Sequence, residues 1–217
     1  QEMARQVAHE IKNPLTPIQL SAERIRHKFE SKLSQDDSNI LKRSTNTIIN
    51  QVNALKIMVN EFAEYARPPK IQKDAIRMEE LVEEVINLYE IAEVIEVIKS
   101  KNLPIIYADK NKLRQVIINL LENSRDALKG IKEPKIIIYI NKKIKEVELV
   151  VEDNGQGIPD EIIGRIFEPY VTSKQTGTGL GLAVVHKIIE EHDGKIIIER
   201  IKNSGTRVKI NLKIGNK

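Results

Sequence analysis

The amino-acid sequence predicts an antiparallel helical hairpin followed by a two-layer α/β sandwich, and two observations support this prediction. Apolar residues recur every three or four positions through residues 1–66, which is the period of an amphipathic α-helix. From residue 71 onward, helical patterns alternate with β-branched runs joined by turn residues, as in a mostly antiparallel sheet covered by helices. We therefore expect two domains, residues 1–67 and residues 71–217.

Two long amphipathic helices are expected in the first domain. Their apolar stripes comprise Val7, Ile11, Leu15, Ile18, Ala22, Ile25 and Phe29, and then Leu41, Thr45, Ile48, Val52, Leu55, Val59, Phe62 and Ala66. The break between the helices should lie within residues 31–39, where Ser34 or Asp36 could cap the second helix. Because this connection is short, the helices should be antiparallel neighbours. Pro14 and Pro17 remove amide donors from the first helix and should bend it.

The hairpin is expected to form a homodimer. One hairpin offers too little partner surface to bury both apolar stripes, and their near-heptad spacing suits supercoiled packing against a second pair. Two copies would then form a four-helix bundle. The second helix cannot continue through residues 67–70, Arg-Pro-Pro-Lys, because proline fixes φ and lacks an amide donor. This junction is the expected domain boundary.

The second domain mixes helical and strand patterns. The expected helices are residues 78–90, 111–129 and 180–192. The expected strands are residues 94–98, 104–107, 136–140, 147–152, 196–199 and 206–212. Polar turn residues join the third and fourth strands, and also the last two, which indicates two hairpins. The last helix should stop at Asp193, with Gly194 in a left-handed C-terminal cap.

The composition excludes several classes of protein. With 41% hydrophobic and 30% charged residues, the 217-residue chain should fold as a soluble protein. It has no cysteine, so disulfides and thiolate metal sites are excluded. The net charge of +4 comes from 35 basic and 31 acidic residues without a basic block, so we expect no nucleic-acid binding. We find no signal peptide and no apolar run of about 18 residues, and expect no membrane contact by this chain. Because it starts at Gln1 inside a predicted helix, we expect it to be a piece of a longer protein.

One histidine stands out near the start of the chain. The helical phase of His9 should turn its imidazole towards solvent, within reach of a donor. The adjacent Glu10 could hydrogen-bond one ring nitrogen, fix the tautomer and raise the nucleophilicity of the other. Taken alone, this peptide is more simply a surface histidine on a bundle helix, but the motifs downstream favour a chemical role. No role is expected for His27, His186 and His192, and the last two have no partner carboxylate at metal-ligand spacing.

Two further motifs suggest a nucleotide site. Asn119 and Asn123 lie four residues apart on a predicted helix, so both amides project from one face. Their oxygens suit a Mg²⁺ ion that also binds triphosphate oxygens. Asp153 ends a β-branched run and could accept a hydrogen bond from an exocyclic amine such as that of adenine, while Gly155 and Gly157 would allow close backbone approach. The simpler interpretations are a polar helix face and an ordinary turn.

A glycine-rich segment opens the last predicted helix. Its freed amides and the helix N-terminus could face phosphate groups; they belong to Gly177, Thr178, Gly179, Leu180 and Gly181. A tight loop before a helix is the simpler interpretation. Residues 165–174 are polar enough to be a mobile lid, from which Lys174 could reach a terminal phosphate or could remain merely solvated.

Taken in order, these motifs resemble the transmitter core of bacterial two-component sensor histidine kinases, and the resemblance covers nearly the whole chain. They are AHEIKNPLTP at residues 8–17, NLLENSRDA at 119–127, DNGQGI at 153–158, FEPYVTSK at 167–174 and GTGLGL at 177–182. The first and fourth are most similar to nitrogen-regulation sensors of the NtrY and NtrB type. The resemblance implies a dimerisation and histidine-phosphotransfer domain followed by a Bergerat-fold ATP-binding domain, as in gyrase, Hsp90 and MutL.

The resemblance also implies roles for single residues. His9 would be the phosphoacceptor and Glu10 its acid/base partner. Asn123 would be the main Mg²⁺ ligand with Asn119 assisting, and Asp153 would read the adenine. The sequence departs from the family after Asn123, where it reads SRDAL in place of a lysine followed by an aromatic residue.

The implied activity is ATP-dependent autophosphorylation of His9 and transfer to an aspartate in the receiver domain of a response regulator. Asn13 matches the position that orients water for dephosphorylation of the regulator. The implied location is cytoplasmic, as part of a membrane-bound sensor. Two alternatives remain at this stage: an ATPase of the gyrase or Hsp90 type, with water as acceptor, and a dimeric interaction module with a degenerate site.

Overall fold

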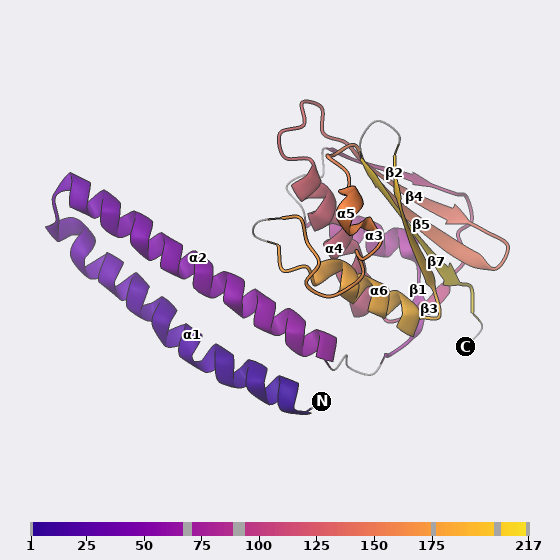
Figure 1. Cartoon of the computed structure of the whole chain (residues 1–217). Helices are drawn as coiled ribbons and strands as arrows, with labels where there is room; N and C mark the ends of the chain where they lie inside the picture. The colour runs from indigo at the N-terminus through magenta and orange to yellow at the C-terminus, as the bar shows by residue number, and fades with distance from the viewer. Residues whose placement is uncertain (1, 67–70, 89–93, 175–176, 202–204, 216–217) are drawn as a thin grey trace. The chain divides into compact units, whose positions relative to one another are not determined.

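The structure is a computed structural model of the chain (Figure 1). It describes residues 2–66, 71–88, 94–174, 177–201 and 205–215. Within the two long helices, the side chains of residues 2–9, 54, 57–58 and 60–66 lie outside the description. The chain divides into two compact units, Gln1–Pro69 and Lys70–Lys217, and the predicted junction at residues 67–70 lies outside the described residues.

The first unit is the predicted helical hairpin. It consists of α1 (Glu2–Phe29), the 3₁₀ turn η1 (Glu30–Lys32) and α2 (Gln35–Ala66). The break is shorter than the predicted 31–39, because Ser34 already caps α2: its Oγ accepts a hydrogen bond from the Asp37 amide at 3.3 Å. Asp36 lies inside the first turn of α2 and is not the cap. The helix assignment of α1 continues through Pro14 and Pro17.

The two helices pack along a narrow apolar seam. Among the described side chains, the buried apolar ones of this unit are Leu15, Ala22, Val52 and Val59. Polar contacts across the seam join Arg26 to Asn46 and Lys56 to Gln19, each at 2.7 Å. Their order along the two helices is that of an antiparallel pair. In the described part of the chain, neither helix is long and apolar enough to cross a membrane, nor is any other.

Both helices also carry apolar side chains that the hairpin leaves exposed. On α1, Ile11, Ile18 and Ile25 follow one another at intervals of seven residues, and each is more than 40% exposed. On α2, Ile48 and Leu55 repeat this interval and this exposure. Residues seven apart lie on the same side of a helix. Each helix therefore presents a continuous apolar row beside the seam.

The second unit is built on a five-stranded sheet with the order β2-β4-β5-β7-β6 (Figure 1). Its strands are β2 (Ile95–Lys99), β4 (Ile136–Lys142), β5 (Glu146–Asp153), β6 (Lys195–Arg200) and β7 (Thr206–Lys213). Only the β2–β4 pair is parallel; β4–β5, β5–β7 and β6–β7 are antiparallel. A separate antiparallel pair joins β1 (Asp74–Ile76) to β3 (Ile106–Ala108).

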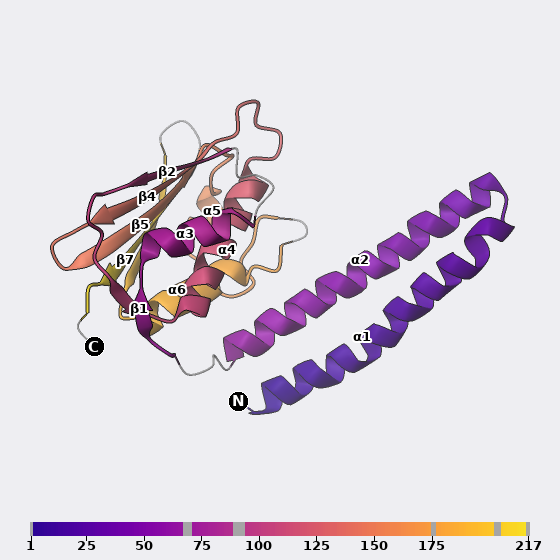
Figure 2. The same ribbon diagram turned by 180° about the vertical axis from the view of Figure 1, so that it is seen from behind.

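Helices cover one face of this sheet (Figures 1 and 2). They are α3 (Met78–Ile86), α4 (Lys110–Ala127) and α6 (Gly181–Glu191). The burial of the strand residues reflects this arrangement. On β4, Ile136, Ile138 and Ile140 are fully buried, whereas the alternate residues Ile137 and Tyr139 are partly exposed. The predicted fold class, a helical hairpin followed by a two-layer α/β sandwich, is thus confirmed.

Several predicted boundaries were wrong. The helix expected over residues 78–90 ends at Ile86, and residues 89–93 lie outside the description. The strand expected at residues 104–107 begins at Ile106, where its pairing with Ile76 begins. The partner strand β1 was not predicted, because three residues carry too little periodicity. Nor was the single helical turn α5 (Asp160–Ile163).

The predicted cap of α6 was also wrong in detail. Asp193, not Gly194, adopts the left-handed conformation, with φ +54°. The amides of Asp193 and Gly194 close the helix on the carbonyl oxygens of Glu190 and Ile189, both at 2.9 Å. Glycine is needed at 194 for another reason: a Cβ there would lie 2.7 Å from the carbonyl oxygen of Asn211 in β7. The glycine lets the chain turn directly into β6.

Candidate functional site

The predicted nucleotide motifs of the second unit lie on helix α4 or in contact with it. Its N-terminus is capped by Asp109, whose Oδ1 accepts from the amides of Asn111 and Lys112 at 3.0 and 3.1 Å. Leu120 and Leu121 are buried in the core. The opposite side of α4 carries Asn119, Asn123 and Asp126, which lie three or four residues apart and therefore share one face.

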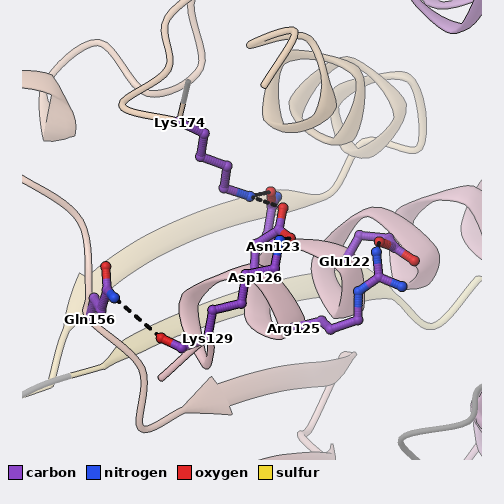
Figure 3. Close-up of polar contacts among 7 residues, drawn as sticks. All are labelled: Glu122, Asn123, Arg125, Asp126, Lys129, Gln156 and Lys174. Carbon is purple, nitrogen blue, oxygen red and sulfur yellow. Dashed lines mark hydrogen bonds and ion pairs between the residues drawn. The ribbon is translucent and has the colours of Figure 1, made fainter. Parts of the chain in front are cut away.

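The two asparagines meet segments that are distant in sequence. Asn119 Oδ1 lies 3.4 Å from the point that a Cβ on Gly181 would occupy, so it sits against the first turn of α6. Asn123 Oδ1 accepts a hydrogen bond from Lys174 Nζ at 3.0 Å (Figure 3). The structure therefore brings together both asparagines, the start of α6 and the lysine of the predicted lid.

Asp153 ends β5 and is 6% exposed. Its Oδ1 accepts from the amides of Gly155 at 2.9 Å and Thr206 at 3.3 Å, and its Oδ2 accepts from Ser124 Oγ at 3.3 Å. Burial raises the pKa of the carboxyl, and these three hydrogen bonds oppose the shift. The carboxyl is thus held in one orientation by the backbone on one side and by α4 on the other.

The segment after Asp153 lies against the C-terminal end of α4. A Cβ on Gly155 would be 2.6 Å from the Ala127 carbonyl oxygen, so only glycine fits there. The Gln156 amide donates to that same oxygen at 3.1 Å, and its side-chain amide donates to the Lys129 carbonyl at 3.4 Å (Figure 3). Gly157 has a φ of +73°, which favours glycine. These contacts explain the two glycines by packing, whatever the ligand.

The glycine-rich segment before α6 is joined to the predicted lid. The Tyr170 amide donates to the Gly179 carbonyl oxygen at 3.0 Å. Gly179 has a φ of +70°, and a Cβ on it would lie 2.5 Å from the Tyr170 carbonyl carbon. At Gly177, a Cβ would lie 2.7 Å from Thr172 Oγ1. Close approach of the two segments therefore requires glycine at 179, where the clash would be with backbone, whereas at 177 it would be with the Thr172 side chain.

Two other residues of this segment contribute through different atoms. Thr178 Oγ1 accepts from the Leu180 amide at 3.3 Å, which orders the entry to α6. Leu180 is fully buried. The lid segment itself is anchored at its start, where Ile166 is buried and the Phe167 ring lies 4.6 Å from the His186 ring.

Two histidines for which no role was predicted do have partners. His186 Nδ1 lies 3.4 Å from Glu190 Oε2, so the statement that it lacks a carboxylate at metal-ligand spacing was wrong. His192 is buried: its Nδ1 donates to the Ile188 carbonyl at 2.7 Å, and its Nε2 accepts from the Asp109 amide at 2.9 Å. This ring connects the end of α6 to the cap of α4. No sequence pattern indicates such a contact between residues 83 positions apart.

The structure adds residues that the sequence did not mark. Ser124 and Thr206 both bind the Asp153 carboxylate. Asp126 Oδ2 lies 2.9 Å from Lys174 Nζ. Asp126 could have been noticed, because it is three positions from Asn123 on the same helix face. Thr206 could not, because only the sheet brings it beside Asp153.

The other predicted site lies on the hairpin. His9 and Glu10 are both in α1, and the side chain of His9, with its predicted exposure, lies outside the described residues. Glu10 and Asn13 are exposed.

Comparison with known proteins identifies a family for each of the two units. Residues 108–216 match the histidine kinase-, DNA gyrase B- and HSP90-like ATPases, and residues 1–70 match the His Kinase A (phospho-acceptor) domain. Nitrogen regulation protein NtrY of Azorhizobium caulinodans is 38% identical over 220 residues, covering 98% of this chain and 28% of that protein. This chain therefore spans less than a third of the length of that relative.

Solved structures give the same result. The catalytic domain of histidine kinase ThkA is 33% identical, with a TM-score of 0.57, over 66% of this chain and 96% of that chain. Histidine kinase ThkA in complex with response regulator protein TrrA is 29% identical, with a TM-score of 0.70, over 99% of this chain and 62% of that one. These matches show that the chain belongs to the sensor histidine kinases and is a core of the NtrY type.

Proposed function

We propose that this chain binds ATP at the α4 site, phosphorylates its own His9 and passes the phosphoryl group to an aspartate of a response regulator. The observation that carries the proposal is the assembly of three sequence segments, those of Asp153, Lys174 and Gly181, around α4, in a chain whose first unit matches a phospho-acceptor domain. Neither the acceptor domain nor the nucleotide site would support the proposal alone. An acceptor histidine needs a donor, and a nucleotide site by itself fits an ATPase equally well.

Each part of the α4 site has a task in this proposal. The buried Asp153 carboxylate accepts a hydrogen bond from the adenine amine, and its orientation is already fixed by Ser124 and Thr206. The amides of Thr178, Gly179 and Gly181 face the phosphates, since a helix N-terminus favours anions, whereas those of Gly177 and Leu180 already donate to the Lys174 carbonyl and to Thr178 Oγ1. Lys174 contributes its positive charge near the terminal phosphate.

The donor groups on α4 also fit a magnesium ion. Asn123 Oδ1 already accepts from the Lys174 ammonium, so a cation is stable at that oxygen. Asn119, one turn away, would assist. Hard amide oxygens suit Mg²⁺, which keeps several waters and takes phosphate oxygens as further ligands. When bound with ATP, the ion would neutralise charge on the transferring group.

His9 is the proposed acceptor, and Glu10 would orient its ring by a hydrogen bond to one nitrogen, leaving the other free to attack. The proposal requires residues 67–70 to let the second unit reach this histidine. It also includes a homodimer. The exposed, heptad-spaced rows through Ile18 and Ile48 support it, because a second hairpin would bury them in a four-helix bundle.

The response regulator is proposed by similarity to ThkA, which has been solved in complex with one. Its docking face would be the exposed surface of α1 around His9. We also propose that Asn13, exposed on that helix, orients water for dephosphorylation of the regulator. If so, Asn13→Ala should keep autophosphorylation but slow the decay of the phosphorylated regulator. Equal decay rates with both proteins would remove this role.

The test of the kinase proposal is incubation with γ-labelled ATP and Mg²⁺, comparing the unmutated chain with His9→Gln. We expect label on the unmutated chain only, lost in acid and stable in base, as for a phosphohistidine. Steady release of free phosphate without labelled protein would favour the gyrase-type ATPase instead. Failure to bind ATP at all would favour a non-enzymatic module.

A further inference from the structure

The contact between Lys174 and α4 has a feature that phosphate binding does not explain. Lys174 Nζ lies 3.0 Å from Asn123 Oδ1 and 2.9 Å from Asp126 Oδ2 (Figure 3). Asp126 uses its other oxygen, Oδ1, to bind Lys129 Nζ at 2.8 Å. The lid lysine is therefore held on α4 by one carboxylate and one amide.

Asp126 is the stronger of these two partners. A carboxylate attracts an ammonium as a full charge, whereas the Asn123 amide contributes only a dipole. Partial burial tends to raise the pKa of Asp126, but the two lysines outweigh it and hold that pKa below its usual value. Asp126 is thus ionised at neutral pH. Without it, Lys174 would have a single neutral hydrogen-bond partner at this position.

The ammonium also sits where the nucleotide's cation would be. Asn123 Oδ1 is the oxygen proposed as the main Mg²⁺ ligand, and Lys174 Nζ is within hydrogen-bond distance of it. A divalent ion on that oxygen and an ammonium beside it would repel each other strongly. The two cations would therefore compete for this oxygen, and a metal ion bound there would disfavour the contact between Lys174 and Asn123.

We propose that Asp126 is a positioning residue that holds Lys174 on Asn123 in the nucleotide-free protein, so that the lysine occupies the cation position until nucleotide displaces it. This inference rests on the proposed nucleotide site. It gives a purpose to the departure from the family pattern after Asn123, where an aspartate stands in the SRDAL segment. The contact also ties the lid to α4.

The sign of one mutational effect separates this role from its alternatives. If Asp126 favours the empty site, its removal should strengthen nucleotide binding. If Asp126 were a metal ligand, or positioned Lys174 only for the bound phosphate, its removal should weaken binding. A charge effect alone would also strengthen binding, since any lost carboxylate near an anionic ligand does so, and a matched control is needed.

Glu122 provides that control. It is one residue before Asn123, is partly exposed like Asp126, and pairs with Arg125 rather than with the lid (Figure 3). Calorimetry should compare Asp126→Asn with Glu122→Gln, using the non-hydrolysable analogue AMPPNP with Mg²⁺. We expect Asp126→Asn to lower the Kd by about two- to fivefold relative to Glu122→Gln, which is the range for partly exposed ion pairs.

Two further measurements tie the effect to the lysine. In a Lys174→Ala background, Asp126→Asn should lower the Kd no more than Glu122→Gln does, because the contact is already gone. In the nucleotide-free protein, hydrogen exchange of residues 170–174 should be faster in Asp126→Asn than in the unmutated chain, and Asp126→Glu should restore part of the protection.

The outcomes are distinguishable from those of the kinase proposal. If the unmutated chain binds AMPPNP and Asp126→Asn binds it equally or more weakly than Glu122→Gln, the inference is wrong and the kinase proposal stands. If Asp126→Asn binds more tightly even with Lys174 removed, the effect does not pass through the lysine and the inference is again wrong. If the unmutated chain binds no nucleotide, both fail.

Discussion

The two units of this chain bury their apolar side chains to different degrees. The sandwich encloses a single large core in which residues of α3, α4, α6 and the sheet are almost completely covered. In the hairpin, the described buried apolar side chains are four, Leu15, Ala22, Val52 and Val59, while rows of isoleucine and leucine remain exposed beside them.

This difference indicates different sources of stability. Burial of apolar surface is the main favourable term in folding, at about 25 cal/mol per Å². The sandwich obtains it within one chain. The hairpin leaves part of its apolar surface in water and would gain further stability from a second copy. We therefore expect mutations in the two units to have separate consequences, and five predictions test that separation, beginning with the strongest effect.

The hairpin should lose its dimer when carboxylates are placed in the exposed apolar rows. For Ile18→Asp combined with Ile48→Asp, we expect the dimer Kd to rise at least about a thousandfold, or about 4 kcal/mol, because buried carboxylates would lack partners. Analytical ultracentrifugation measures this. The control is Leu20→Asp, also exposed but about 200° around α1 from Ile18, which should leave the dimer intact. A monomeric unmutated chain would contradict the dimer.

The sandwich should be sensitive to a methyl group at Gly205. A Cβ there would lie 2.0 Å from the Asp153 carbonyl oxygen, and φ is +109°, so Gly205→Ala should cost about 3 kcal/mol or more. Gly130→Ala isolates the backbone strain, since φ is +82° but no described atom lies within 4 Å, and should cost about 1 kcal/mol. Hydrogen exchange in β5 and β7 reports both. Equal costs would show that the predicted clash is relieved.

Nucleotide binding should fail without disturbing the hairpin when Asp153 is changed to asparagine. An asparagine has one NH₂ group, which would face either the adenine amine or the backbone N–H groups of Gly155 and Thr206. Because all of these groups are donors, a hydrogen bond would be lost in either orientation. We expect AMPPNP affinity to fall at least about a hundredfold, or about 2.7 kcal/mol, by calorimetry. The dimer should persist in ultracentrifugation. Unchanged affinity would refute the adenine assignment.

The helix caps of the two units should differ in strength. Asp109→Ala removes three accepted amides, those of Gln72, Asn111 and Lys112, and should destabilise the start of α4 by about 1–2 kcal/mol. Ser34→Ala removes an exposed cap of α2 and should cost only about 0.5 kcal/mol. Hydrogen exchange at each helix start measures both, and equal losses would contradict the comparison.

The α4 cap should also depend on pH. Partial burial tends to raise the pKa of Asp109, but the hydrogen bonds from the three amides outweigh it and hold that pKa below its usual value. A carboxylate with a lowered folded pKa stabilises the fold above its unfolded pKa of 3.8, and this contribution is lost as pH falls through the folded value. The loss should be absent in Asp109→Ala. A pH dependence shared by both proteins would place its origin elsewhere.

Much of the fold could be predicted from periodicity. The long helices and the two hairpins of the sheet have strong, regular patterns, and they were found within a few residues. The misses were of two kinds. The strand β1 and the turn α5 are too short to show a period. The left-handed residue at Asp193 depends on the space around Gly194, which is set by β7 and not by local sequence.

The candidate site was predictable where its residues form short segments and not where they meet across the fold. Asn119 and Asn123 share a helix face, which spacing reveals. The partners of Asp153 come from α4 and from β7, and the partner of Lys174 is Asp126, 48 residues away. Such contacts arise only when the sheet and α4 are assembled.

We propose that one reaction needs both units: the hairpin carries the phosphoryl acceptor and the sandwich binds the nucleotide. The most direct measurement is to incubate the chain with ATP and Mg²⁺, digest it at mildly alkaline pH and locate the phosphoryl group by tandem mass spectrometry. We expect phosphate on His9 of the unmutated chain and no phosphate on His9 of the Asp153→Asn variant. Phosphate on another residue, or its release without any phosphopeptide, would contradict it.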